Sequence, residues 1–304
     1  MVNKGENSSV PVTASPLRYP GGKSRLAKYF SHLLRANGLT DCTYVEPFAG
    51  GAGAAIDLLR KEYVRTVWLN DVDPAIHALW HSVLNSTEAL CDLIRDTPIS
   101  GEEWLRQRAV LENSDASFLE RGFATLYLNR TNRSGIIRGG LIGGIRQDGK
   151  WRLDARFNRE GLIVKIARIA SYRDRLTIQR DDALVFLQLT VLPSRKRMFV
   201  YLDPPYYGKG QDLYHNHYTH DDHIALAAFV QTHMSHVPWV VSYDDHPKIR
   251  NAYGDCRQLE YGINYSAADR YRGGEVLFFS PAISHPLLID PLRVSKHARA
   301  CNVT

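Results

Sequence analysis

The sequence lacks the features that define several common protein classes. It has four cysteines in 304 residues. They are too scattered for a disulfide framework or a cysteine metal site. No apolar run approaches the roughly 20 residues that span a bilayer, and segment 1–15 has no apolar centre of the kind found in signal peptides. We therefore expect a cytoplasmic, nucleoid-associated protein without disulfides or a membrane anchor.

The composition has no excess of acidic residues. The net charge is +6 and the pI about 9.1, which is a mild indication of a polyanionic partner. Hydrophobic residues make up 44% and charged residues 23%, as in ordinary globular proteins. The length fits one large domain, or one domain that carries an insertion.

A strand, a glycine turn, a helix, a second strand and an acid follow one another near the N-terminus. The expected strands are 43–45 and 66–69, and the expected helix 54–61 follows Gly50, Gly51 and Gly53. This order predicts the start of a doubly wound nucleotide-binding sheet. We expect the sheet to continue with strands 177–179, 198–202, 239–243 and 275–280, and with helices 182–189 and 220–236.

The glycine turn fits neither of two familiar phosphate-binding motifs. A dinucleotide motif beginning at Gly51 requires glycine where Ile56 stands, and a phosphate loop ending in Lys23 requires glycine at Leu17. Asp71 lies about 20 residues beyond the glycines, where an acid binds ribose hydroxyls, although it could also cap a turn or helix. A ligand with ribose but no pyrophosphate is consistent with S-adenosylmethionine.

The strand at 198–202 ends at Asp203-Pro204-Pro205-Tyr206. Two prolines remove two backbone donors and stop the strand, so a rigid loop presents a carboxylate, carbonyls and a ring. Ligands of open α/β sheets bind at this end of the strands. The loop could be an ordinary turn, but it suits a flat substrate that bears an amine.

The region between the two halves of the sheet has a different pattern. We predict a disordered tail over 1–15, a catalytic domain over 16–86 and 173–290, a mainly helical target-recognition insertion over 87–172, and a C-terminal tail over 291–304. Eight basic residues lie between Arg130 and Arg159, opposed by two aspartates. Gln147-Asp148-Gly149-Lys150 predicts a β-hairpin turn with arms 141–146 and 151–153, and such a ribbon can enter the major groove.

Five motifs, taken in order, resemble the Dam-like D12 class of N6-adenine DNA methyltransferases. They are Arg18-Tyr19-Pro20-Gly21-Gly22-Lys23, Glu46-Pro47-Phe48-Ala49-Gly50-Gly51-Ala52-Gly53, Asn70-Asp71, Asp182, and Asp203-Pro204-Pro205-Tyr206. Their order is that of the family's alpha arrangement. The resemblance implies a Rossmann-like α/β methyltransferase sheet with the inserted recognition domain, and S-adenosylmethionine as cofactor.

The resemblance also assigns roles to residues. Those expected to bind the cofactor are Tyr19, Lys23, Glu46, Pro47, Phe48, Gly50, Gly51, Gly53, Asp71, Asp182 and Asp203. Asp203 and the Pro204 carbonyl, supported by Pro205, would hold the N6 amine of adenine while Tyr206 stacks on the base. Direct methyl transfer then requires the base to leave the duplex.

Double-stranded DNA is the expected partner, and a cognate restriction endonuclease is a possible one. The residues expected to contact DNA are Asn129, Arg130, Arg133, Ser134, Arg138, Arg146, Lys150 and Arg152. Ser134 departs from the family, many members of which have asparagine there. We expect a monomer or weak dimer.

Other functions remain open at the level of sequence. A cytosine-N4 or RNA adenine methyltransferase would use a similar loop, and an inert relative would bind DNA without turnover. Histidines 215, 217, 220 and 223 could bind zinc, although a loop over the active site explains them as well; we predict no metal.

Overall fold

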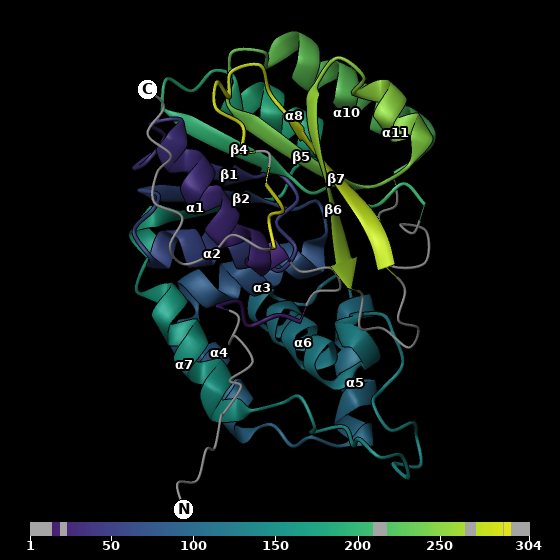
Figure 1. Ribbon diagram of the computed structural model, residues 1–304. Helices are drawn as coiled ribbons and strands as arrows, with labels where there is room; N and C mark the ends of the chain where they lie inside the picture. The colour runs from purple at the N-terminus through teal and green to yellow at the C-terminus, as the bar shows by residue number, and fades with distance from the viewer. Residues whose placement is uncertain (1–13, 19–22, 209–217, 265–271, 288, 293–304) are drawn as a thin grey trace, which may run out of the picture.

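The sheet of this protein has seven strands, as seen in a computed structural model (Figure 1). The structure describes residues 14–18, 23–208, 218–264, 272–287 and 289–292. The strand order is β3-β2-β1-β4-β5-β7-β6. The strands are β1 (Thr43–Glu46), β2 (Thr66–Asn70), β3 (Leu176–Gln179), β4 (Met198–Leu202), β5 (Trp239–Asp244), β6 (Arg257–Asn264) and β7 (Arg272–Phe279).

The first five strands are parallel, and β7 runs antiparallel to both β5 and β6. Strands β1, β2 and β3 follow one another from the centre of the sheet to one edge, and β4, β5, β7 and β6 follow one another from the centre to the other edge. The strand order therefore reverses between the neighbours β1 and β4. In sheets of this kind, ligands bind beyond the carboxyl ends of the strands at this reversal. The predicted α/β sheet is confirmed.

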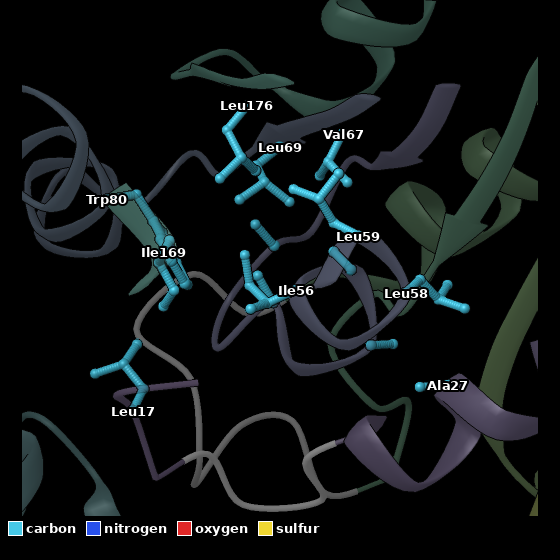
Figure 2. Close-up of a cluster of buried hydrophobic side chains, with 14 of the residues drawn as sticks. Leu17, Ala27, Ile56, Leu58, Leu59, Val67, Leu69, Trp80, Ile169 and Leu176 are labelled. Atoms are coloured by element: carbon cyan, nitrogen blue, oxygen red, sulfur yellow. The ribbon is translucent and has the colours of Figure 1, made fainter. Parts of the chain in front are cut away.

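Helices cover both faces of the sheet, which explains the continuous apolar runs of its central strands. Helices α1 (Leu26–Ala36), α2 (Gly53–Arg60) and α3 (Pro74–Asn85) pack on one face. Helices α8 (Ala183–Phe186), α10 (His220–His233) and α11 (Pro247–Ala252) cover the other face, with a π-helical turn after α8 (Figure 1). Figure 2 shows Ile56 and Leu59 of α2 close to Val67 and Leu69 of β2.

Four helices form the insertion between α3 and β3. They are α4 (Thr87–Asp96), α5 (Gly101–Glu112), α6 (Phe118–Thr131) and α7 (Arg159–Ala170). Their apolar side chains join the same buried cluster as α1 to α3. Gly122 of α6 lies so close to α3 that a Cβ there would be 2.5 Å from the Ser82 hydroxyl. The insertion is thus packed tightly on helix α3.

The predicted hairpin in the insertion is wrong. Among the described residues, segment 136–158 forms turns, with one isolated bridge between Asn132 and Leu141. Gly143 and Gly144 have φ values of 83° and 70°, which break an extended arm. The Gln147 amide donates to the carbonyls of Ile142 and Gly144, and its oxygen accepts from Leu153 N at 2.8 Å. A side chain thereby replaces the cross-strand hydrogen bonds that a ribbon would need.

Two elements near the C-terminus were not predicted. Strand β6 has polar residues in much of its length, and α11 is a short helix capped by His246. Strand β7 begins earlier than the apolar run from Glu275 indicated, and helix α10 ends at His233 rather than His236.

In the described part of the chain, no helix has the length and apolar character needed to cross a membrane.

Candidate active site

The two motif loops meet at the reversal of the strand order. The glycine turn leaves the carboxyl end of β1, and Asp203-Pro204-Pro205-Tyr206 leaves that of β4, its hydrogen-bonded neighbour. The β2 end carries Asp71 and the β3 end carries Asp182, so four predicted segments gather along one edge of the sheet.

The glycine turn has a backbone shape that explains its composition. Gly50 has a φ of 44°, which glycine adopts without steric cost, whereas Ala52 takes the same φ at a steric cost from its methyl group. The turn is fixed from outside, because the Trp80 indole donates to the Gly50 carbonyl at 2.9 Å. A Cβ on Gly53 would lie 3.0 Å from the Ser24 Cβ, so a larger residue at this position would require Ser24 to shift.

Asp71 joins the second strand to the glycine turn. Its Oδ2 accepts from Gly50 N at 2.8 Å and its Oδ1 accepts from Asp73 N at 3.0 Å. Burial raises the pKa of Asp71 to about 7, although these two hydrogen bonds oppose the rise. Each carboxylate oxygen can accept a further hydrogen bond, which is the capacity that binding of ribose hydroxyls requires. Asp71 also has the alternative role of a turn aspartate, because its Oδ1 accepts from the N–H two residues on, whereas the cap of helix α3 is Asp73, which accepts from Ala75 N.

Further side chains fix the ends of β1, β2 and β3. The Asn70 amide donates to the carbonyls of Pro47 and Asp181, both at 3.0 Å. Asp182 is exposed and caps α8 by accepting from Leu184 N at 2.9 Å. Phe48 is half-buried, and the centroids of the Phe48 and Tyr218 rings are 5.6 Å apart. Asn70, which the motif comparison included without a role, thus holds the chain after β1 to the chain after β3.

Asp203 is held by one of its two carboxylate oxygens. Oδ1 accepts from the Ser242 hydroxyl at 2.6 Å and lies 3.6 Å from the Lys23 ammonium. The side chain is 28% exposed, whereas that of Lys23 is 6% exposed. Burial raises the pKa of Asp203, while the charge of Lys23 and the Ser242 hydrogen bond limit the rise. The carboxylate is therefore both fixed and accessible.

Lys23 braces the Asp203-Pro204-Pro205-Tyr206 loop from within the protein. Its ammonium donates to Glu275 at 2.7 Å and to the Tyr206 hydroxyl at 2.8 Å. Glu275 is fully buried and also accepts from Tyr206 and Tyr261, both at 2.5 Å. Burial alone would raise the pKa of Glu275, but Lys23 and these hydrogen bonds lower it. Lys23 thus directs its ammonium to protein groups.

Tyr206 lies inside this network. Its side chain is 5% exposed, so stacking on a base would require the ring to leave its present position. Glu275 and Ser242 were not predicted, although the sequence does carry a signal for both. Ser242 interrupts the apolar run of β5 and Glu275 directly precedes that of β7, and burial of such polar residues is costly unless they are hydrogen-bonded.

Glu46 ends β1 beside the same loop. It is buried and accepts from the Tyr44 hydroxyl at 2.9 Å. Burial raises the pKa of Glu46 to about 8, and the nearby charge of Asp203 contributes to the rise. Tyr19 of the N-terminal motif lies outside the described residues.

The sequence matches the family model of the D12 class N6 adenine-specific DNA methyltransferases over residues 19–267. The chain belongs to this family. It is also 24% identical over 252 residues to the Type II methyltransferase M.CviBI of Paramecium bursaria Chlorella virus NC1A, covering 82% of this chain and 90% of the viral protein. A solved structure, the rRNA methyltransferase aviRa from Streptomyces viridochromogenes, aligns over 88% of both chains with 19% identity and a TM-score of 0.39.

This methyltransferase buries two of the residues predicted to contact DNA. Asn129 is fully buried; its amide donates to the carbonyls of Arg18 and Gly135, and its oxygen accepts from Arg18 N at 2.8 Å. Arg130 is half-buried and donates to the Pro16 carbonyl at 2.7 Å. Burial lowers the pKa of Arg130 to about 10. Both side chains fix the segment that leads to Lys23, and this placement does not support direct DNA contact.

The other predicted DNA contacts lie on the surface. Exposed or half-exposed residues of the insertion are Arg133, Ser134, Arg138, Arg146, Lys150 and Arg152. Two apolar residues are exposed among them, Ile145 at 89% and Trp151 at 56%. The basic loop that we define as residues 133–152 therefore presents positive charge and apolar surface together.

Of the four histidines that follow the Asp203-Pro204-Pro205-Tyr206 loop, His220 is exposed at the start of α10, with its Nδ1 3.0 Å from the Tyr207 hydroxyl. His215 and His217 lie outside the described residues. His223 is buried, its Nδ1 lies 2.9 Å from the Tyr243 hydroxyl, and burial lowers its pKa to about 4. Within the described ranges no three histidine, cysteine or acidic side chains are grouped as metal ligands would be. His223 thus has a packing role.

Proposed function

We propose that this N6-adenine DNA methyltransferase holds its target amine between the Asp203 carboxylate and the Pro204 carbonyl. The observation that carries the proposal is the placement of an accessible carboxylate, fixed on one side, at the end of β4 where β1 and its glycine turn adjoin it. The adenine amine is a weak nucleophile because its lone pair is delocalised into the ring. Two acceptors on its two hydrogens localise this pair and balance the positive charge that develops on nitrogen.

The cofactor site that we propose lies along the same edge. S-adenosylmethionine supplies the electrophilic methyl group when it is bound. Asp71 fits the ribose, since both its oxygens retain an acceptor position, and the glycine turn admits a close approach to the backbone. Phe48 and Asp182 border this edge, and Glu46 and Pro47 shape the turn that leads into it.

Lys23 and Tyr206 take indirect roles in this proposal. Their contacts with Glu275 support a function in fixing the catalytic loop, and Lys23 places a positive charge close to Asp203. Fixed placement of a reacting group contributes to rate because it removes orientational freedom before the reaction.

The DNA duplex is proposed to bind on the insertion side through the basic loop. Its exposed arginines and Lys150 suit phosphate oxygens, which makes affinity fall with salt. Adenine N6 is paired inside a duplex, so we propose that the base flips out to reach Asp203. The name of the viral relative, a Type II methyltransferase, supports the hypothesis of a cognate restriction endonuclease. A monomer or weak dimer remains our proposal for the assembly.

The proposed site is tested by transfer of labelled methyl from the cofactor to duplex DNA. Wild-type protein should transfer label, and Asp203→Ala should lose about 10²-fold or more of the rate, since one group that stabilises developing charge carries that much. Asp92→Ala removes an exposed aspartate of α4 and is the matched control. Equal rates for Asp203→Ala and wild type would refute the role of Asp203.

A further inference from the structure

The catalytic carboxylate is asymmetric in a way that the family motif does not specify. The contacts of Asp203 with Ser242 and Lys23 are both made by Oδ1. Within the described residues, Oδ2 makes no hydrogen bond, and the side chain keeps 28% of its surface exposed. One oxygen is thus bound by the protein, and the other faces away from these contacts.

Ser242 reaches Asp203 because of the register between two strands. Leu202 of β4 is paired with Val241 of β5, so the residues that follow them, Asp203 and Ser242, also lie side by side. Ser242 is fully buried in a strand whose other members near it are Trp239, Val240, Val241 and Tyr243. A buried hydroxyl on such a strand is costly unless it is hydrogen-bonded.

The direction of the hydrogen bonds follows from counting protons. The single Ser242 hydroxyl proton is given to Asp203, which as a carboxylate can only accept. The Tyr201 hydroxyl, 2.8 Å from Ser242 Oγ, must then be the donor of that bond. Tyr201, Ser242 and Asp203 therefore form a chain that points toward Oδ1.

We propose that Ser242 is a positioning residue, which binds Oδ1 so that Oδ2 is presented to the substrate amine, and that Tyr201 orients the Ser242 hydroxyl. This inference rests on the proposed role of Asp203. It predicts that one carboxylate oxygen and the Pro204 carbonyl together receive the two amine hydrogens. The rotation of the carboxylate is set before the substrate binds, which is the preorganisation that fixed dipoles contribute to catalysis.

The electrostatic surroundings define what loss of Ser242 should do. The charged or titratable side chains that act on Asp203 are Lys23 and Glu275, and those on which Asp203 acts include Glu46, Tyr44 and Tyr201. The Ser242 hydrogen bond favours the charged carboxylate and lowers its pKa. Its removal should raise that pKa, so the acid limb of the kcat profile should move to higher pH.

The test compares Ser242→Ala with Ser242→Thr, which keeps the hydroxyl, and with Ser280→Ala. Ser280 is a buried serine next to β7 that donates to a backbone carbonyl at 2.7 Å. We expect Ser242→Ala to lose about 10- to 100-fold in kcat, a range typical of a displaced catalytic group, with KM for DNA and cofactor within about twofold. Ser242→Thr should recover most of the rate, Tyr201→Phe should lose less than Ser242→Ala, and Ser280→Ala should keep the wild-type profile.

A second readout separates this inference from the proposed function. The Asp203 carboxyl pKa, followed by carbon NMR, should be higher in Ser242→Ala than in wild type whether or not the protein methylates DNA. An inactive wild type with this shift would refute the catalytic role and leave the contact intact. A wild-type kcat profile and an unshifted carboxyl pKa in Ser242→Ala would overturn the inference.

Discussion

The surroundings of Asp203 and the basic loop of the insertion use polar residues in opposite ways. Around Asp203, buried charges and hydroxyls are paired with one another, and one carboxylate remains partly accessible. In the basic loop most charged side chains are exposed, whereas Arg130, which precedes it and turns inward, binds a backbone carbonyl. The burial of a charge near a motif therefore has to be known before the charge is assigned a function, because a buried charge is bound to partners within the protein and an exposed one is available to a partner molecule.

The largest effect is expected from breaking the buried pair. Lys23→Met leaves Glu275 charged and fully buried, and loss of one partner of such a pair costs about 3–5 kcal/mol. Arg95→Met breaks the exposed pair with Asp92 and should cost much less, because solvent screens such a pair. Chemical denaturation of both variants measures the difference. Equal losses of stability in the two variants would contradict the claim that breaking the buried ion pair costs more than breaking an exposed one.

The next effect concerns a residue that the motif assigns to DNA. Asn129→Ala leaves the backbone groups of Arg18 and Gly135 without their amide partners, which should destabilise the fold by about 2–3 kcal/mol. Asn85→Ala, at an exposed position of α3, is the control. Denaturation should separate the two variants. If Asn129→Ala is as stable as wild type but binds DNA more weakly, the prediction that Asn129 contacts DNA directly would be supported instead.

Exposed basic residues should show the reverse pattern. Replacing Arg146, Lys150 and Arg152 together by glutamine should weaken duplex binding about tenfold and lower the salt slope by about 2–3, near 0.9 for each phosphate that is no longer neutralised. Stability should stay within about 0.5 kcal/mol, as for surface changes. The matched triple replaces Lys61, Arg95 and Arg173, so the net charge changes equally. If both triples weaken binding alike, overall charge rather than the basic loop drives association.

A further effect, of another kind, is a pH dependence of stability from Glu46. The folded state keeps this proton up to a pKa of about 8, whereas its ordinary value is 4.5. The folded protein therefore loses stability as pH rises between these values, because the unfolded chain releases its proton first. In Glu46→Gln, Tm should fall with rising pH by a few degrees less than in wild type. In Glu112→Gln, the fall of Tm should equal that of wild type. Melting curves recorded from pH 5 to 8.5 measure the dependence of Tm on pH. The same dependence in Glu46→Gln and wild type would contradict the raised pKa of the buried Glu46 carboxyl.

The sequence was most informative where a motif lies next to a buried strand. Strand 198–202, the glycine turn and Asp71 were placed correctly because apolar runs and glycines impose local constraints. The hairpin failed because Gln147 binds backbone groups through its side chain, which residue patterns do not reveal. Ser242 and Glu275 come from strands far along the chain, so their contacts depend on the register of the sheet rather than on any local spacing.

Asp203 is proposed to direct methylation to the adenine amine of DNA, and the reaction product reports on this role without an intermediate step. The decisive experiment is nucleoside mass spectrometry of duplex DNA treated with wild-type or Asp203→Ala protein and S-adenosylmethionine. We expect N6-methyladenine with the wild type and a loss of about 10²-fold or more with the variant. N4-methylcytosine as the product, or undiminished N6-methyladenine with Asp203→Ala, would contradict the proposed role.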